Sequence, residues 1–381
     1  MLDDFGQRIR DIILSEMDLS RELSDEEICD LIGSVVSREA RDRPMTIKDR
    51  AELERTIFNS LRKLDVLQEL VDDRDVTEIM VNGPNDIFYE KAGRIQRFKG
   101  HFSSEEKLED VIQQIVGRHN RVVNQASPIV DTRLSDGSRV NIVLNPISIG
   151  GSAVSIRKFP EHPMSMERLV EIEALSPEVA RLLQILMQAK YNIFISGGTG
   201  SGKTTFLNAL SQYIPDDERI ITIEDSAELQ LLGAKNIVRL ETRNANTDGV
   251  TPITIRDLIR TALRMRPDRI IVGECRGAEA LDMLQAMNTG HDGSLSTGHA
   301  NSPHDIISRI ETMVLQGQDF PLNAIRQQIA SGIDIIVQLG RLRDKSRRVL
   351  EISEVDGFMD GEIVLHTLYR FEETAVLDSG R

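Results

Sequence analysis

Residues 197–204 read GGTGSGKT, which fits the phosphate-binding pattern G-x-x-x-x-G-K-[ST] at every position. The apolar run NIFIS precedes this loop and TFLNAL follows it, so its context is a strand that leads into a helix. Glycines let successive backbone N–H groups converge on phosphate oxygens, and the helix N-terminus adds partial positive charge. The stretch therefore predicts a loop that cradles the phosphates of a nucleotide.

Two side chains of this loop have specific expected tasks. Lys203 would place a cation at the β- and γ-phosphates, and the hydroxyl of Thr204 would ligate Mg²⁺. The other candidates for nucleotide contact are the remaining residues of the loop and the first helical turn: Gly198, Thr199, Gly200, Ser201, Gly202 and Thr205. The expected ligands are therefore ATP and Mg²⁺.

Two acidic clusters follow at the ends of apolar, strand-like runs. ITIEDSAE contains Glu224, Asp225 and Glu228, and RIIVGE ends at Glu274. The carboxyl ends of parallel strands form the ligand crevice of an open α/β sheet, so we expect both clusters to face the nucleotide. Hydrolysis needs carboxylates to hold Mg²⁺ and to orient water, and Glu274 is a second expected metal ligand. A surface or capping carboxylate is the alternative for each residue.

Residues 290–301, GHDGSLSTGHAN, predict a tight, adaptable loop because most of them are small. We favour His299 as a donor to the γ-phosphate. A lone histidine is more often structural than functional, and the sequence leaves His291 open between these two interpretations.

The region after about residue 165 has the pattern of an α/β domain. The apolar runs YNIFISG, RIITIED, RIIVGE and IDIIVQL alternate with helical patterns. Such alternation predicts a parallel sheet flanked by helices. The basic stretch 341–348 is either a docking surface or an exposed hairpin tip, and we favour the hairpin tip.

The region of residues 66–158 has a different pattern. Paired strands are expected around turns at 82–84 and 92–93, and a hairpin at Asp136-Gly137. Ser103 and Glu106 predict a capping box at the start of a helix. We therefore expect a compact α+β domain on a mostly antiparallel sheet.

The first 65 residues read as helices, and Ser24 with Glu27 forms a second expected capping box. Two prolines lie in FPEHPM, which makes this segment the expected linker. The expected organisation is a helical segment, an α+β domain, the linker and an α/β domain: 1–65, 66–158, 159–164 and 165–381.

Composition limits the class of protein. The 381 residues carry a net charge of −15, which argues against a protein that mainly coats nucleic acid. Cys29 and Cys275 are the two cysteines, too few for a zinc site or a disulfide framework, and both are expected to be reduced, buried thiols. With neither a signal-peptide pattern nor a run of about 20 apolar residues, we expect a cytoplasmic protein without a transmembrane segment.

A family resemblance rests on the motifs in their order. GGTGSGKTT, IEDSAELQL and RPDRIIVGECRGAEALDMLQAMNTGHDGSLSTGHANSP resemble the Walker A, Asp box, Walker B and His box of the type II/type IV secretion traffic ATPases. The last stretch looks closest to the CpaF (TadA-type) branch, which powers tight-adherence (Tad/Flp) pilus assembly. VTEIMVNGP, SPIVDTRLSDGSRVNIV and VSIRKF match the N-terminal domain of that branch. The resemblance implies a RecA-like P-loop ATPase domain preceded by a PAS-like α+β domain.

The resemblance also implies roles for single residues. Glu274 takes the Walker B acidic position, and His299 matches the histidine that senses the γ-phosphate. Glu228 matches the glutamate that orients the attacking water, with Glu224 and Asp225 beside it. These roles agree with the chemistry inferred above from residue type and position.

Two arginines enter the site only through the resemblance. Arg139 and Arg157 match N-terminal-domain arginines that reach over the nucleotide, where they would offset charge on the γ-phosphoryl group. Without the family, both are ordinary strand arginines.

The family further implies an assembly and its partners. Its members are similar in forming hexameric rings, so we expect a homo-hexamer that associates peripherally with the inner membrane through platform proteins of the pilus or secretion machine. The four-cysteine zinc element of related branches is absent, and neither zinc nor direct nucleic-acid contact is expected. SLRKLDVLQELVDD stands where close relatives carry a Gly-rich, Pro-containing segment, which leaves the start of the second domain open.

Three functions stay under consideration. The first is an ATP-hydrolysing motor for a Tad/Flp-type pilus. The second is the ATPase motor of a type IV secretion system that exports protein or DNA. The third is a non-hydrolysing, nucleotide-gated interaction module, against which the intact set Lys203, Thr204, Glu228 and Glu274 argues.

Overall fold

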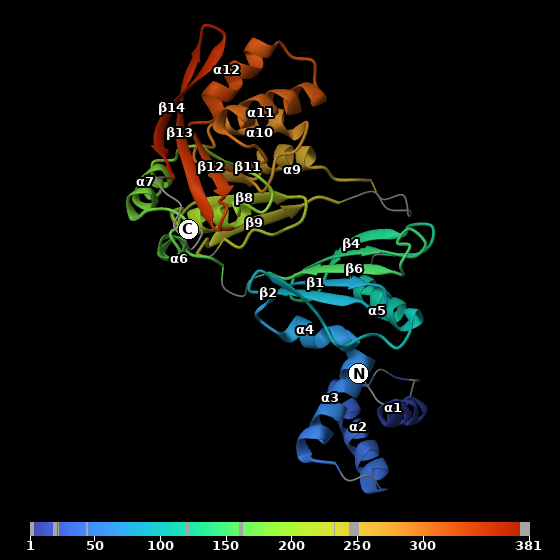
Figure 1. Cartoon of the computed structure of the whole chain (residues 1–381). Helices are drawn as coiled ribbons and strands as arrows, with labels where there is room; N and C mark the ends of the chain where they lie inside the picture. The colour runs from blue at the N-terminus through green and yellow to red at the C-terminus, as the bar shows by residue number, and fades with distance from the viewer. Residues whose placement is uncertain are drawn as a thin grey trace. The chain divides into compact units, whose positions relative to one another are not determined.

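The computed structural model describes residues 4–17, 21, 23–42, 45–118, 122–159, 163–231, 233–243 and 251–373. The chain divides into two compact units, Met1–Glu161 and His162–Arg381, which Figure 1 shows from blue to red. Residues 160–162 of the expected linker lie outside the described residues. Each unit is described below by itself.

The first unit begins with a series of helices, and the longer ones share a small core. They are α1 (Asp4–Glu16), α2 (Asp25–Glu39), η1 (Ala40–Asp42), α3 (Ile47–Arg62), η2 (Asp65–Leu67) and α4 (Gln68–Asp72). Ser24 and Glu27 form the expected capping box at the start of α2. Ile28 and Ile32 point into the core, whereas Cys29, one residue further round the helix, is exposed. The expectation that both cysteines are buried is therefore wrong for Cys29.

The rest of the first unit, as far as its residues are described, is an antiparallel sheet with one helix. The strand order is β3-β2-β1-β6-β5-β4. The strands are β1 (Val76–Asn82), β2 (Ile87–Lys91), β3 (Arg94–Arg97), β4 (Ile129–Arg133), β5 (Arg139–Val143) and β6 (Ala153–Arg157). Helix α5 (Glu105–Gly117) starts one residue later than predicted, because Ser104 is its N-cap and its hydroxyl accepts from the Lys107 N–H.

The second unit is built on an eight-stranded sheet in the order β14-β13-β12-β7-β11-β10-β8-β9. The strands from β12 to β9 in this order are parallel, while β13 and β14 pair antiparallel with their neighbours. The strands are β7 (Ile193–Gly197), β8 (Arg219–Glu224), β9 (Asn236–Glu241), β10 (Arg269–Val272), β11 (Leu295–Gly298), β12 (Ile335–Arg341), β13 (Arg347–Met359) and β14 (Glu362–Arg370).

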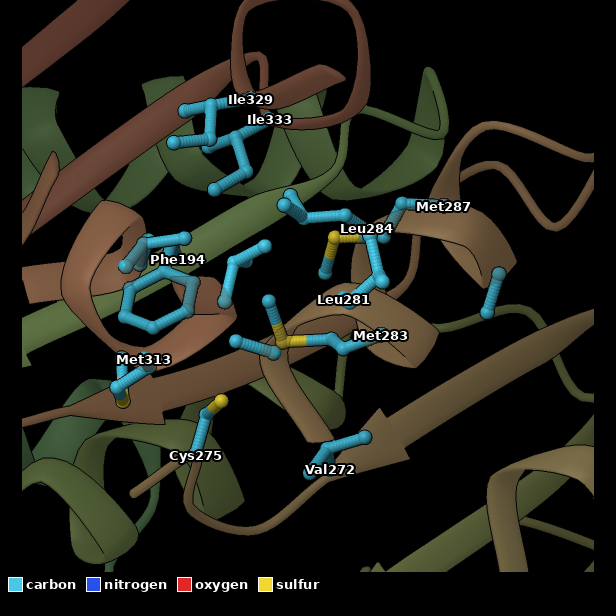
Figure 2. Packing of buried hydrophobic residues seen from close by; sticks show 14 of the residues in the cluster. Phe194, Val272, Cys275, Leu281, Met283, Leu284, Met287, Met313, Ile329 and Ile333 are labelled. Carbon is cyan, nitrogen blue, oxygen red and sulfur yellow. The ribbon is translucent and has the colours of Figure 1, made fainter. Parts of the chain in front are cut away.

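Helices cover both faces of this sheet. They are α6 (Met166–Glu171), α7 (Pro177–Gln188), α8 (Lys203–Ser211), α9 (Ile255–Ala262), α10 (Glu279–Met287), α11 (Pro303–Gly317) and α12 (Leu322–Gly332). Side chains alternate along β7, so Phe194 packs with α9–α12 on one face, while Ile193 and Ile195 pack with α6–α8 on the other. Figure 2 shows the first of these cores, which includes the buried Cys275.

One segment differs from its sequence interpretation. Leu295–Gly298, inside the expected glycine-rich loop, is a fully buried strand between β7 and β10. Only the residues flanking it are free to form loops. The strand was not predicted because its small side chains do not form an apolar run like those of the neighbouring strands.

Among the described residues, no helix combines the length and apolar character that crossing a bilayer requires.

Candidate nucleotide-binding site

The glycine loop joins β7 to α8 in a tight turn. Gly202 is the N-cap of α8 and has a φ of 93°, which favours glycine. A Cβ placed on Gly197 would lie 2.7 Å from the carbonyl oxygen of Leu339 and 2.6 Å from the hydroxyl of Ser201. Glycine is therefore required at both positions, one for the backbone angle and one for close packing against β12.

The loop has the properties that a phosphate chain needs. A Cβ added to Gly198 or Gly200 would meet no atom within 4 Å, so this part of the loop is open. The Lys203 ammonium points back over the loop and donates to the carbonyl oxygens of Gly197 at 3.1 Å and Gly198 at 3.3 Å. Burial lowers the pKa of Lys203 despite the nearby carboxylate of Glu274. The residues present fit an anion that would bring compensating negative charge to this ammonium.

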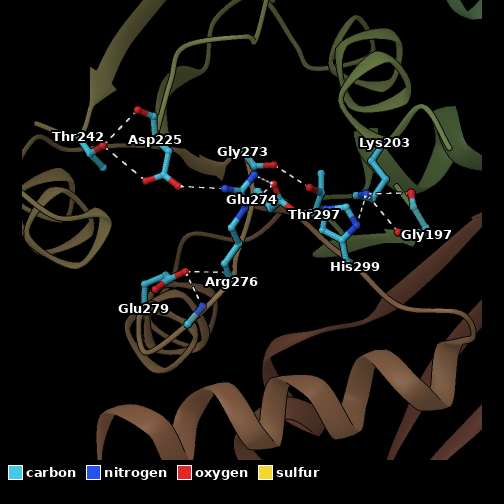
Figure 3. A network of polar contacts seen from close by, with 12 residues as sticks. Gly197, Lys203, Asp225, Thr242, Gly273, Glu274, Arg276, Glu279, Thr297 and His299 are labelled. Carbon is cyan, nitrogen blue, oxygen red and sulfur yellow. Dashed lines mark hydrogen bonds and ion pairs between the residues drawn. The ribbon is translucent and has the colours of Figure 1, made fainter. Parts of the chain in front are cut away.

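A line of contacts leads from Lys203 to the second acidic cluster (Figure 3). The Lys203 Nζ lies 3.2 Å from Nδ1 of His299, and Nε2 of His299 lies 2.6 Å from Oε1 of Glu274. An ammonium can only donate, so Nδ1 of His299 accepts, and the proton of the neutral ring is on Nε2, the nitrogen that faces Glu274. Burial and the Lys203 charge lower the pKa of His299, which keeps the imidazole neutral at pH 7.

Arg276 connects Glu274 to the first acidic cluster. Its Nε donates to Oε2 of Glu274 at 2.8 Å, and its Nη1 lies 3.7 Å from Oδ2 of Asp225. The backbone N–H groups of Arg276 and Gly277 donate to Oε1 of Glu279, which holds the loop after β10. Arg276 was not predicted from the sequence. Its signal in the sequence was its position two residues after the glutamate at the end of a strand, and a solvent-exposed surface arginine can have the same position.

The three acidic residues after β8 differ in their surroundings. Glu224 is only 4% exposed, and its Oε1 accepts from the backbone N–H groups of Glu228 at 2.8 Å and Leu229 at 2.9 Å. Asp225 is exposed and pairs with Arg276, and Glu228 is partly buried on the turn that Glu224 organises. Glu224 therefore shapes the loop that carries Asp225 and Glu228.

His291 lies apart from this cluster. It precedes β11, whereas His299 directly follows it, so the strand separates the two histidines. Nδ1 of His291 contacts the carbonyl oxygen of Ala286 at 3.2 Å, at the end of α10. The geometry favours the structural interpretation of His291.

Arg139 and Arg157 belong to the first unit. The register of β5 and β6 places them directly opposite each other, and Glu78 of β1 lies opposite Arg157. Their neighbours Val140 and Ile156 point to the buried face, so both arginines lie on the other face of the sheet. The fold thus brings together Arg139 and Arg157, which are 18 positions apart in the sequence.

The partly buried His299 predicts a pH-dependent stability. Because the folded state lowers the pKa of His299, the unfolded chain binds this proton more readily, and stability is lost as pH falls below about 6.5 toward the lowered value. The charged groups that act on it are Lys203, Glu274, Arg276 and Arg309. The drop in Tm between about pH 7.5 and about pH 5.5 should be smaller in His299→Gln than in the wild type.

His304→Gln is the control for this measurement, because His304 is exposed at the start of α11. Its Tm should follow the wild type at both pH values. Equal drops in the wild type and His299→Gln would contradict the assignment.

Comparisons with known proteins agree with this geometry. A family model described as "Type II/IV secretion system protein" matches residues 60–373. The chain is 33% identical over 320 residues to the type IV secretion system protein PtlH of Bordetella pertussis, covering 77% of this chain and 94% of PtlH. It is 31% identical over 332 residues to the conjugal transfer protein TrbB of Rhizobium radiobacter, covering 86% and 98%.

Among solved structures, the fold is similar to the crystal structure of the pilus retraction motor PilT with bound ADP. The TM-score is 0.58 at 23% sequence identity, over 81% of this chain and 82% of that chain. The X-ray structure of the ATPase DotB of Legionella pneumophila gives a TM-score of 0.53 at 22% identity, over 76% and 79%. Both likenesses concern the fold.

Proposed function

Because the chain belongs to the type II/IV secretion system protein family, we propose that it hydrolyses ATP and converts the released free energy into mechanical work. The observation that carries this proposal is the line of contacts from Lys203 through His299 to Glu274. It places a cation suited to phosphates one side chain away from a carboxylate suited to catalysis.

The direct test is a phosphate-release assay on the purified full chain with ATP and Mg²⁺. Turnover is expected. Nucleotide binding without any phosphate release, under conditions where the protein is assembled, would favour the non-hydrolysing module instead.

The proposed roles combine the positions of the side chains with the roles that the family resemblance implies. The loop amides and Lys203 bind the phosphates, and Thr204 and Glu274 would hold Mg²⁺, which supplies charge neutralisation at the β- and γ-phosphates when bound. Glu228 orients the attacking water, with Asp225 beside it. His299 reports the presence of a γ-phosphate, because Lys203 must shift its hydrogen bonds when it engages phosphate oxygens.

Arg276 is expected to position the carboxylates. Its guanidinium contacts both Glu274 and Asp225, so Arg276→Ala should leave nucleotide affinity nearly unchanged and lower kcat by roughly 10- to 100-fold through misplacement of Glu274. Arg276→Lys keeps the charge without the forked geometry and should recover only part of kcat. A wild-type kcat in Arg276→Ala would contradict this role.

Arg157 is proposed to act on bound nucleotide from the first unit. Arg157→Ala should reduce turnover by about 10-fold or more while the fold is kept, because its side chain is exposed on a strand. Arg94→Ala, an exposed arginine on β3 of the same sheet, is the matched control and should retain activity. Equal activities in the two variants would remove the proposed role of Arg157.

We further propose a homo-hexamer that powers a Tad/Flp-type pilus and associates with the inner membrane through platform proteins. The motif stretch RPDRIIVGECRGAEALDMLQAMNTGHDGSLSTGHANSP, which looks closest to the CpaF branch, supports this role. The names of PtlH and TrbB favour a second candidate, a motor for type IV secretion. Introducing Glu274→Gln into the host should abolish surface pili under the first proposal and substrate export under the second.

A further inference from the structure

The β12–β13 hairpin lies beside the phosphate loop. Strand β12 pairs in parallel with β7 as far as Leu339 opposite Gly197, and then continues past the end of β7 to Arg341. Strand β13 begins at Arg347, directly opposite Arg341. A Cβ placed on Gly202 would lie 3.4 Å from Cδ of Arg347, so the stem of this arginine is close to the N-cap of α8.

The base of the hairpin presents two arginines on the face that α8 covers. Leu339 and Val349 both belong to the core that α8 shares. Arg341 lies two residues after Leu339 and Arg347 two residues before Val349, so both arginines are on that same face. Both are exposed, which leaves their guanidinium groups accessible to a ligand on the loop.

The hairpin lies on the opposite side of the loop from the catalytic candidates. The strand order β12-β7-β11-β10-β8 puts His299, Glu274 and Asp225 after strands on one side of β7, and the hairpin on the other side. A nucleotide whose γ-phosphate faces Glu274 must therefore direct its α-phosphate and nucleoside toward the hairpin. This step rests on the proposed function.

We propose that Arg347, with Arg341 beside it, is a further nucleotide-binding residue that contacts the α-phosphate side of bound ATP or ADP. A guanidinium offers several donors in a fixed plane and stays charged at any physiological pH, which suits a phosphate. ATP and ADP share their α-phosphate, so this contact stabilises both to the same extent. Contacts from Glu274 and His299, by contrast, distinguish the two nucleotides.

The test compares Arg347→Ala, Arg347→Lys and the control Arg343→Ala in the full chain. Arg343 is an exposed cation in the turn of the same hairpin, so its loss changes the net charge equally. Calorimetry with Mg²⁺ and either ADP or a non-hydrolysable ATP analogue should show about 10-fold weaker binding of both ligands to Arg347→Ala. Arg347→Lys should bind with intermediate affinity, and Arg343→Ala like the wild type.

Steady-state kinetics supply a second readout. Loss of a contact that is made equally in the ground and transition states raises KM and leaves kcat at saturation unchanged, so Arg347→Ala should show this split. Equal affinities of Arg347→Ala and Arg343→Ala, with the wild type binding ADP, would overturn this inference alone. A wild type that binds neither ligand would overturn the proposed function as well.

Discussion

Lys203→Ala is expected to lose nucleotide binding almost completely. The ammonium is held over the loop by the carbonyl oxygens of Gly197 and Gly198, at the position where phosphate oxygens would gather. A charge-assisted contact in a largely water-excluded site contributes several kcal/mol, so its loss should weaken affinity by on the order of 10²-fold or more. The measurement is the rise in Tm on adding ATP or ADP, which should be present in the wild type and absent in the variant.

The fold of Lys203→Ala should survive. Burial lowers the pKa of Lys203, so its charge is carried at a cost and its removal should not lower the Tm measured without nucleotide. Lys235→Ala is the matched control, because Lys235 is an exposed lysine of the same unit that pairs with Asp216. If Lys203→Ala kept the ligand-induced rise in Tm, the phosphate site would lie elsewhere.

The sequence predicted the parts of the second unit whose signal is local. The strands that carry the site are mostly apolar and are buried on both faces, and the glycine loop is contiguous in the chain, so both could be read directly from the residues. Strand β11 lacks such a signal because Leu295–Gly298 contains mostly small side chains. Its burial depends on the neighbours β7 and β10, which are distant in sequence.

The same distinction applies to the site. Glu274 and Asp225 could be placed together in advance, because strand order alone sends the ends of parallel strands to one edge. Their bridging by Arg276 depends on the turn that Glu279 stabilises, which no residue pattern specifies. The position of the Arg347 side chain near Gly202 likewise depends on how far β12 extends past β7.

Glu274→Gln is expected to separate binding from turnover. The substitution keeps the size of the side chain and one acceptor oxygen, but it removes the charge that faces His299 and Arg276. We expect affinity for ATP to stay near that of the wild type, because the loop and Lys203 are untouched. We expect kcat to fall by at least about 10²-fold, the range found for loss of a group that stabilises charge developing in the transition state, because Glu274 would help to hold Mg²⁺ there.

The decisive measurement is the pair of values, nucleotide affinity and kcat, compared with Lys203→Ala. Glu279→Gln is the matched control, since its amide oxygen can still accept the two backbone N–H bonds that Glu279 receives. That variant should keep most of the wild-type kcat. This result would show that the effect of Glu274→Gln comes from the position of Glu274 and not from a general loss of negative charge nearby. Normal turnover in Glu274→Gln would transfer the catalytic role to the turn after β8, where Glu228 is the carboxylate that the family resemblance implies.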